Sequence, residues 1–401
     1  MPTPEVETLR EFYSAMHGTI EVRRRLVTDV VEGRPPDPEG VGHLRVVRDA
    51  LRAIPCTPDG RRLARSDGRS IHVDLAYELD ELDKDLAFLA HGDEAVLDLL
   101  RERRPDADDE RSELVAALDD VDLRTFVTDR DGTVNNYCGR YASSVQSVWN
   151  AVFLTRFERS RVERALVLTS APLDDIGIAD LTVTAPGTFV VAGSKGREYV
   201  DEAGRRRRYP IDDDRQRRLD ELNDGLDDLL GRPGRSVFTL IGSGRQHKFG
   251  QTTIAYQDVT DSVPDDRAAE FREEVTSLVR EIDPDRSYFR IEDTGLDLEL
   301  VLTVDDTSDG PSRDFDKGDG LRFLDADIPL GMDRGASLVC GDTASDETMM
   351  IASAELAPQV RTVYVTANRQ RRAEVSAAVG DTLFASEPDV LVAALNDLAG
   401  R

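Results

Sequence analysis

The chain has 401 residues, of which 39% are apolar, and this length suits two or three domains that each bury a core. It carries 51 basic and 79 acidic residues, and the net charge of −28 excludes nucleic acids and anionic membranes as expected partners. No apolar run approaches the roughly 20 residues that cross a bilayer, and the first residues lack a signal-peptide pattern, so we expect a cytoplasmic protein.

Lysine is rare in this sequence, because the 51 basic residues include only four lysines: Lys84, Lys195, Lys248 and Lys317. An acidic composition that prefers arginine to lysine resembles that of a salt-adapted, halophilic organism. The wide planar fork of arginine does not replace a compact ammonium in a tight pocket. We therefore expect these lysines at positions where arginine would fail. The three cysteines are widely spaced and indicate neither a disulfide framework nor a zinc cluster.

Residues 1–110 are expected to form an N-terminal helical domain. Apolar residues recur at helical spacing in Leu9–Val31, Leu44–Ile54 and Ile71–Ala90. The polar stretch Glu102–Arg111, which contains a proline and several aspartates, is interpreted as a linker. The sequence assigns no function to this domain, and we expect it to mediate self-association into a homo-oligomer or to brace the rest of the chain.

After the linker, short apolar segments alternate with helical patterns, which is typical of a parallel α/β sheet. The predicted strands are Thr125–Thr128, Ala165–Thr169, Thr188–Val191, Ser337–Val339 and Thr362–Val365. The sequence therefore predicts an α/β fold for this part of the chain.

A unit of different pattern interrupts this sheet between its third and fourth strands. Each half of the unit reads as a helix followed by two strands: Asp213–Leu230, Ser236–Ile241 and Thr252–Gln257, then Asp266–Ile282, Ser287–Ile291 and Leu296–Val304. Such an insert predicts a separate lid over the sheet. The segment Asp305–Gly318, rich in Asp, Ser and Gly, is expected to be the return hinge or loop.

Two aspartates, Asp129 and Asp131, directly follow the strand Thr125–Thr128 and project to the same side of an extended chain. In an open α/β sheet, ligands bind at the carboxyl ends of the strands. Two carboxylates there suit a nucleophile beside a general acid/base, with one divalent cation shared between them. Because Gly132 follows, an ordinary Asp-Gly turn is the alternative for this segment taken alone.

A second pair of carboxylates, Asp342 and Asp346, follows another predicted strand, and Thr169, Ser170 and Lys317 lie between the two pairs in sequence. A hydroxyl and an ammonium are the groups that a phosphoryl group needs at its oxygens. Structural alternatives are a strand end for Thr169, a surface position for Lys317 and a helix cap for Asp346. The rarity of lysine favours a functional role for Lys317.

Taken together and in this order, these motifs resemble those of the haloacid dehalogenase superfamily of phosphatases, over about residues 121–401. The resemblance implies a Rossmann-like parallel-sheet catalytic core formed by residues 111–205 and 311–401. It also implies that the insert, residues 206–310, is an α+β cap of the C2 type that sets substrate specificity.

The same resemblance implies a role for each matching residue. Asp129 would attack phosphorus and form an aspartyl-phosphate, and Asp131 would act as the general acid and then the general base. Thr169, or alternatively Ser170, would bind a phosphoryl oxygen, and Lys317 would neutralise the transferring group. Mg²⁺ would be the cofactor, held by Asp129, Asp342 and the backbone carbonyl of Asp131, with Asp346 supporting the site.

Within the superfamily, four short segments are similar to those of trehalose-6-phosphate phosphatases. They are Ala192-Gly193-Ser194-Lys195-Gly196-Arg197-Glu198, Arg245-Gln246-His247-Lys248-Phe249, Asp316-Lys317-Gly318 and Gly341-Asp342 followed by Asp346-Glu347. The resemblance implies that Lys195, Glu198, Lys248 and Glu299 bind the sugar. Two departures from the family pattern are a lysine at 195 where the family has histidine, and Ser170-Ala171-Pro172 after the second motif.

The expected function is therefore a magnesium-dependent sugar phosphatase, with trehalose 6-phosphate as the best substrate. Sucrose phosphate and glucosyl- or mannosyl-3-phosphoglycerate are alternative substrates on the same scaffold. A phosphomutase of the superfamily and a non-catalytic sugar-phosphate sensor are the alternative functions.

Overall fold

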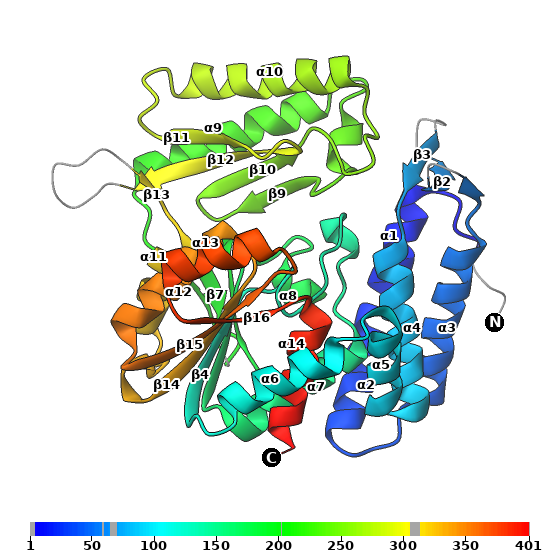
Figure 1. Ribbon diagram of the computed structural model, residues 1–401. Helices are drawn as coiled ribbons and strands as arrows, with labels where there is room; N and C mark the ends of the chain where they lie inside the picture. The colour runs from blue at the N-terminus through cyan, green and yellow to red at the C-terminus, as the bar shows by residue number, and fades with distance from the viewer. Residues whose placement is uncertain (1–4, 58–59, 65–69, 202, 305–312, 401) are drawn as a thin grey trace.

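The apolar runs predicted as strands lie side by side in the central sheet of the computed structural model, which describes residues 5–57, 60–64, 70–201, 203–304 and 313–400 (Figure 1). Among these residues the sheet has eight strands, in the order β16-β15-β14-β4-β5-β6-β7-β8. The first six of that order are parallel to their neighbours, and β7 and β8 extend one edge as antiparallel strands. The bounds are Leu123–Thr128 (β4), Arg164–Leu168 (β5), Val190–Gly193 (β6), Glu198–Val200 (β7), Arg206–Arg208 (β8), Ala336–Gly341 (β14), Gln359–Val365 (β15) and Thr382–Ala385 (β16).

Helices cover both faces of this sheet, because alternate residues of each buried strand point to opposite sides. In β4, Phe126 joins the core under α7 and α14, whereas its neighbour Val127 joins the core under α11 and α12. The helices of this part of the chain are α6 (Ala107–Leu118), α7 (Val148–Arg161), α8 (Ile178–Leu181), α11 (Lys317–Asp327), α12 (Ala344–Leu356), α13 (Arg369–Val379) and α14 (Pro388–Ala399). The α/β fold expected from the sequence is confirmed.

The N-terminal part is a bundle of helices that stands beside the core and packs against α7 (Figure 1). Its elements are α1 (Leu9–Gly18), α2 (Ile20–Val31), α3 (Pro38–Ala53), α4 (Ala76–His91) and α5 (Asp93–Arg103), with the strands β1 (Cys56–Thr57), β2 (Gly60–Ala64) and β3 (Ser70–Val73) between α3 and α4. The sequence did not predict these strands. The expected linker Glu102–Arg111 is also wrong, because its second half begins helix α6, which packs against α14.

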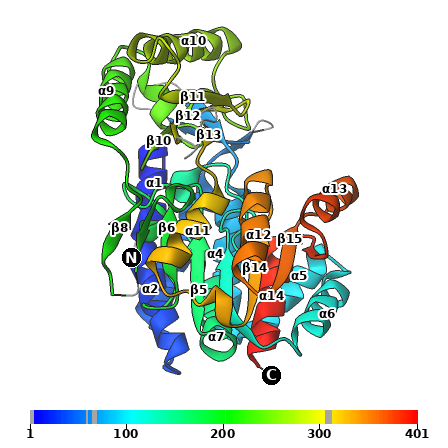
Figure 2. The same ribbon diagram turned by 90° about the vertical axis from the view of Figure 1, so that its left-hand side faces the viewer.

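The insert lies over the carboxyl ends of the core strands, and its antiparallel sheet faces the core while α9 and α10 lie on the far side (Figures 1 and 2). Its strand order is β11-β12-β10-β9, with β13 pairing β12. The bounds are α9 (Asp213–Leu230), β9 (Arg245–Lys248), β10 (Gln251–Ala255), α10 (Asp265–Ile282), β11 (Phe289–Asp293), β12 (Asp297–Val304) and β13 (Arg313–Asp314). The predicted strand Ser236–Ile241 is wrong, because Ser236–Thr239 forms a short 3₁₀ helix.

The predicted return hinge lies partly outside the described residues, which exclude 305–312, and its last two residues begin helix α11. No helix in the described part of the chain is long and apolar enough to cross a membrane.

Candidate active site

Asp129 and Asp342 lie side by side because β4 and β14 are neighbouring parallel strands. Thr128 pairs with Cys340 in the register of the sheet, and the backbone N–H of Asp129 donates to the carbonyl of Cys340 at 3.0 Å. Gly132 makes the close approach possible, since a Cβ at this position would lie 2.2 Å from Asp342 Oδ2. The φ of Gly132 is +91°, which other residues rarely adopt.

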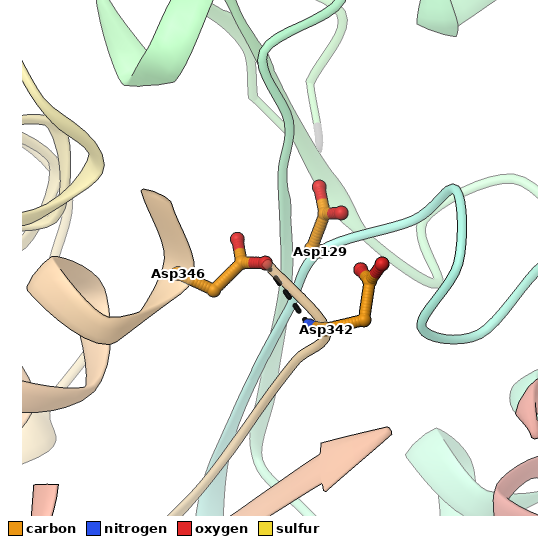
Figure 3. Close-up of side chains that lie close together, drawn as sticks. All are labelled: Asp129, Asp342 and Asp346. Carbon is orange, nitrogen blue, oxygen red and sulfur yellow. Dashed lines mark hydrogen bonds between the residues drawn. The ribbon is translucent and has the colours of Figure 1, made fainter. Parts of the chain in front are cut away.

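The carboxylates of Asp129, Asp342 and Asp346 converge at this edge of the sheet (Figure 3). Within the described part of the chain they form a group that could hold a metal ion, with one oxygen from each residue within 4.8 Å of the others. Carboxylate oxygens are the ligands that hard divalent cations such as Mg²⁺ prefer. The side chain of Asp131 is outside this group. Its predicted part in the metal site therefore rests on its backbone carbonyl.

The raised pKa values of two of these carboxylates also fit a site that binds a cation. Burial, and then the neighbouring carboxylates Asp129 and Asp346, raise the pKa of Asp342 to about 8. Burial raises the pKa of Asp129 to about 6, although Lys317 opposes the shift. A bound divalent cation would offset both the burial and the mutual repulsion of the carboxylates.

Lys317 is the central cation of the site. Its side chain is 2% exposed, and Nζ donates to Asp129 Oδ1 at 2.7 Å and to Asp346 Oδ1 at 2.6 Å. Lys317 is the first residue of α11, whose N-cap Asp316 forms a capping box with Asp319. The alternative of a surface lysine is wrong.

Both carboxylate oxygens of Asp346 accept hydrogen bonds. Its Oδ2 accepts hydrogen bonds from the backbone N–H of Asp342 at 3.0 Å and of Thr343 at 2.8 Å. The N-cap of helix α12 is Thr343, and Asp346 completes a capping box from the third helical position, so the capping alternative holds at that position and not at the N-cap. Its Oδ1 accepts from Lys317. Asp346 therefore orders both the loop that carries Asp342 and the ammonium that faces Asp129.

Asp131 lies beside the metal group in a hydrogen-bonded setting of its own. Its Oδ1 accepts from Arg130 Nη1 at 2.7 Å, from Ser144 Oγ at 2.8 Å and from Asn135 Nδ2 at 3.3 Å. The side chain is 20% exposed, and it lines a cavity of about 150 Å³ between the core and the insert. An acid in this position can exchange a proton with a ligand in the cavity.

Thr169 lies at the carboxyl end of β5, next to the strand that carries Asp129. It is buried, and its Oγ accepts from the backbone N–H of Ala171 at 3.2 Å, which leaves the hydroxyl hydrogen to donate elsewhere. Ser170 follows at the start of the next loop. The choice between Thr169 and Ser170 stays a prediction.

Two of the scarce lysines meet across the boundary between core and insert. Glu299 Oε2 lies 3.7 Å from Lys195 Nζ, and Glu299 Oε1 lies 3.8 Å from Lys248 Nζ. Burial alone would raise the pKa of Glu299, but Lys248 and then Lys195 hold it below its ordinary value. Burial lowers the pKa of Lys248. The structure thus brings together three of the four residues predicted to bind the sugar.

Glu198, the fourth, acts on the neighbouring loop. It is buried, its Oε1 accepts from Ser194 Oγ at 2.9 Å, and Ser194 Oγ itself accepts from the backbone N–H of Phe249 in the insert at 2.9 Å. Ser194 and Lys195 both have positive φ values, 55° and 60°. Residues other than glycine held in this region are often found at functional sites.

Two further polar residues of the insert line the cavity that Asp131 also lines, and they were not predicted as site residues. Gln246 and Asp297 line it together with Tyr137 and Tyr141 of the core. Gln246 shares a strand with Lys248, and Asp297 shares a strand with Glu299, in each case two residues away. Because residues two apart point to the same face of a strand, this spacing was the signal that could have found them.

Comparisons with known proteins agree with these motifs. The family model "Trehalose-6-phosphate phosphatase, C-terminal" matches residues 126–391, and the model of the "Trehalose-6-phosphate phosphatase N-terminal helical bundle domain" matches residues 8–100. An "Alpha,alpha-trehalose-phosphate synthase [UDP-forming] 1" of Aphelenchoides avenae is 31% identical over 97% of this chain and 35% of its own length. A "Trehalose-phosphatase" of Caenorhabditis elegans is 33% identical over 67% of this chain and 62% of its own length.

The chain thus spans about a third of the synthase and less than two thirds of the phosphatase. Among solved structures, the C-terminal domain of trehalose-6-phosphate phosphatase from C. albicans superposes with a TM-score of 0.46 and 15% identity, over 72% of this chain and 96% of that one.

Proposed function

The chain belongs to the trehalose-6-phosphate phosphatase family, and from this premise we propose that it is a magnesium-dependent phosphatase that converts trehalose 6-phosphate to trehalose and phosphate. One observation carries the proposal: buried Lys317 bridges Asp129 and Asp346, and one oxygen of Asp342 lies within 4.8 Å of an oxygen of each of these two carboxylates. This arrangement supports the proposal because it would put a nucleophile, a cation that neutralises it and a group of metal ligands at the end of one strand pair.

In the proposed mechanism, Asp129 attacks phosphorus, and the bond between phosphorus and the sugar oxygen breaks as an aspartyl-phosphate forms. Asp131 gives its proton to the leaving alkoxide, then takes a proton from the water that hydrolyses the intermediate. Lys317 and the Thr169 hydroxyl stabilise the charge on the phosphoryl oxygens. Magnesium held by Asp129, Asp342 and the Asp131 carbonyl would offset the repulsion between a carboxylate and a phosphate dianion.

The proposed sugar site is the boundary between the insert and the core. Lys195, Lys248 and Glu299 offer a mixed set of donors and acceptors at close range, which suits a substrate rich in hydroxyl groups. Glu198 would position the loop that carries Lys195. In this proposal residues 111–205 and 311–401 are the catalytic core, 206–310 the cap that selects the substrate, and 1–110 an appended helical domain.

The alternative substrates and functions can be distinguished by the experiment described below. Sucrose phosphate and glucosyl- or mannosyl-3-phosphoglycerate offer similar hydroxyl groups to the cap. A phosphomutase would return the phosphoryl group to a sugar instead of water, and a sensor would bind without turnover. The acidic charge of −28 supports an enzyme that works at high salt.

The test is phosphate release from a panel of these sugar phosphates, with magnesium at high salt. We expect release from trehalose 6-phosphate, loss of release in Asp129→Asn, and no loss in the matched variant Asp122→Asn. Asp122 is an exposed aspartate near the opposite end of the same strand. If the wild-type protein is folded, binds magnesium and releases phosphate from no ester, the phosphatase proposal is wrong. Isomerised sugar phosphate would then indicate the mutase, and binding alone the sensor.

A further inference from the structure

Helix α4 of the N-terminal bundle directs polar side chains onto the core segment 134–149, which follows Asp131 and leads into α7. The side chains recur at helical spacing, so they share one face of the helix. They are Tyr77, Glu78, Glu81, Lys84 and Asp85. Four of them hydrogen-bond directly with residues of this segment. The fifth, Lys84, instead pairs with Asp389 of helix α14.

The start of α7 depends on this helix. Ser147, its N-cap residue, makes no capping bond with its side chain. Asp85 Oδ1 of the bundle accepts instead from the backbone N–H of Val148 at 2.6 Å, and its carboxylate is paired with buried Arg23 at 3.0 Å. Arg23 also donates to the carbonyl of Val145 at 3.0 Å. A bundle residue thus satisfies a backbone donor that a helix normally satisfies from its own sequence.

Further contacts hold the middle of the segment. Ser143 Oγ donates to Glu78 Oε1 at 2.6 Å, and both side chains are buried. Asn136 Nδ2 donates to Glu81 Oε1 at 2.9 Å. His17 of helix α1 adds a contact of 2.7 Å between its Nε2 and the carbonyl of Ala142. The segment therefore takes its conformation from the bundle as much as from the core.

This conformation reaches the carboxylate of Asp131 through two residues. Asn135 Nδ2 lies 3.3 Å from Asp131 Oδ1 and 3.1 Å from Tyr77 Oη, so one amide bridges the aspartate and helix α4. Tyr77 Oη also donates to the carbonyl of Val145 at 3.3 Å. Ser144 Oγ, next in the chain to that carbonyl, donates to Asp131 Oδ1 at 2.8 Å.

We propose that Tyr77 is a positioning residue for Asp131, and that the N-terminal bundle contributes in this way to proton transfer at the active site. The inference rests on the proposed phosphatase function. Tyr77 holds the Asn135 amide and the Val145 carbonyl, and these set two of the three donors to Asp131 Oδ1, those of Asn135 and Ser144. The third donor is Arg130 Nη1. Because these donors occupy Oδ1, the proton that Asp131 gives to the leaving oxygen is then carried by the other carboxylate oxygen, Oδ2.

Leaving-group dependence separates this role from a merely structural one. A sugar alkoxide needs a proton as it leaves, whereas 4-nitrophenolate leaves without one. The ratio kcat/KM reports the first phosphoryl transfer, in which Asp131 acts as the acid. Because general acid catalysis is worth about 10²- to 10⁴-fold, we expect Tyr77→Phe to lower kcat/KM for the sugar phosphate about tenfold. For 4-nitrophenyl phosphate the expected change is at most about twofold, since no proton is required.

The matched control is Tyr13→Phe, which removes another bundle hydroxyl, one that donates to the carbonyl of Leu240 at 3.1 Å. We expect it to leave the ratio between the two substrates unchanged. Ser144→Ala, which removes a direct donor to Asp131, should change the ratio in the same direction as Tyr77→Phe. Equal losses on both substrates in Tyr77→Phe and Ser144→Ala would overturn the inference while leaving the phosphatase function intact. A wild-type protein inactive on both substrates would instead contradict the function itself.

Discussion

Lys317 Nζ lies 2.7 Å from Asp129 Oδ1, and both side chains are buried. Asp129 follows β4, which precedes the insert in sequence, whereas Lys317 begins α11, which follows it. The pair therefore joins the two segments of the core that the insert separates. Removing one partner of a buried pair leaves the other charge without compensation. The pair therefore links the stability of the site to its reactivity.

Replacing the ammonium should affect both properties. We expect Lys317→Met to abolish phosphate release and to lower the free energy of unfolding by about 3–5 kcal/mol, because two carboxylates lose their cation. Added magnesium should recover part of that stability but none of the activity. Urea unfolding with and without magnesium measures the first effect. Lys317→Arg keeps the charge but not the compact shape, and full activity in that variant would contradict the requirement for a lysine.

Magnesium affinity should depend on pH. The pKa of Asp129 is raised to about 6 and that of Asp342 to about 8. Protons must leave these carboxylates before a cation binds, so affinity should rise between pH 6 and 8 and level off above. Because both pKa values are raised, these groups stabilise the metal-free protein below their unfolded pKa values, and that stability is lost as pH rises through 6 and 8.

Calorimetry of magnesium binding in buffers with different ionisation enthalpies counts the protons released. The variant Asp342→Asn should lose the release near pH 8 and keep the release near pH 6. An affinity that is constant across this range would show that the carboxylates are already ionised without the metal.

Glu299 should contribute to substrate binding rather than to chemistry. It lies between Lys195 and Lys248, so Glu299→Gln removes a charge that both lysines face. We expect KM for trehalose 6-phosphate to rise about ten- to a hundredfold, since losing a hydrogen bond to a charged group costs about 1.5–3 kcal/mol, with kcat changed little. Glu292→Gln is the matched control: Glu292 is exposed and pairs with Glu299 on the neighbouring strand. A fall in kcat without a change in KM would assign Glu299 to the chemical step.

Burial should decide how much each of two similar charge clusters contributes to the free energy of unfolding. Lys84 pairs with Asp80, Glu81 and Asp389, and its side chain is 1% exposed. We expect Lys84→Met to lower the free energy of unfolding by about 3–5 kcal/mol.

Arg101 also pairs with three carboxylates, but its side chain is 32% exposed, so Arg101→Met should cost about 0–1 kcal/mol. Urea unfolding measures both. Equal costs would mean that the number of ion pairs, and not their burial, sets the stability.

The sequence predicted the elements whose apolar pattern is unambiguous. The runs around Val127, Leu166 and Val339 are buried on both faces of a parallel sheet, so they appear as continuous apolar segments. Asp129 and Asp342 were singled out because each follows such a strand. Lys317 begins helix α11, which the sequence did not predict, and it was singled out because lysine is rare. The resemblance to a known family then supplied the expected roles of these residues. In the structure their side chains lie close together.

The errors have a physical cause as well. Strand β9 was not predicted because its sequence, Arg245-Gln246-His247-Lys248, is polar and has no apolar alternation. The apolar Val237 and Phe238 were predicted as part of a strand, but they are buried in a 3₁₀ helix. Helix α6 begins with Asp108, Asp109 and Glu110, which resemble a linker but favour the start of a helix.

Helix α4 shows a further limit of sequence patterns. Glu81, Lys84 and Asp85 look like a solvated face, yet all are buried against the core. No apolar periodicity could reveal that a second part of the chain supplies their partners. The position of the bundle beside segment 134–149 therefore needed the structure.

The placement of the four lysines has a practical consequence for chemical labelling. Lys84, Lys248 and Lys317 are buried, and the side chain of Lys195 is 13% exposed at the boundary between the core and the insert. An amine-directed reagent, which modifies many surface positions on most proteins, would find its side-chain targets here almost entirely in and around the active site. Covalent probes with a mild acylating group could therefore report substrate protection of these lysines without any engineered residue.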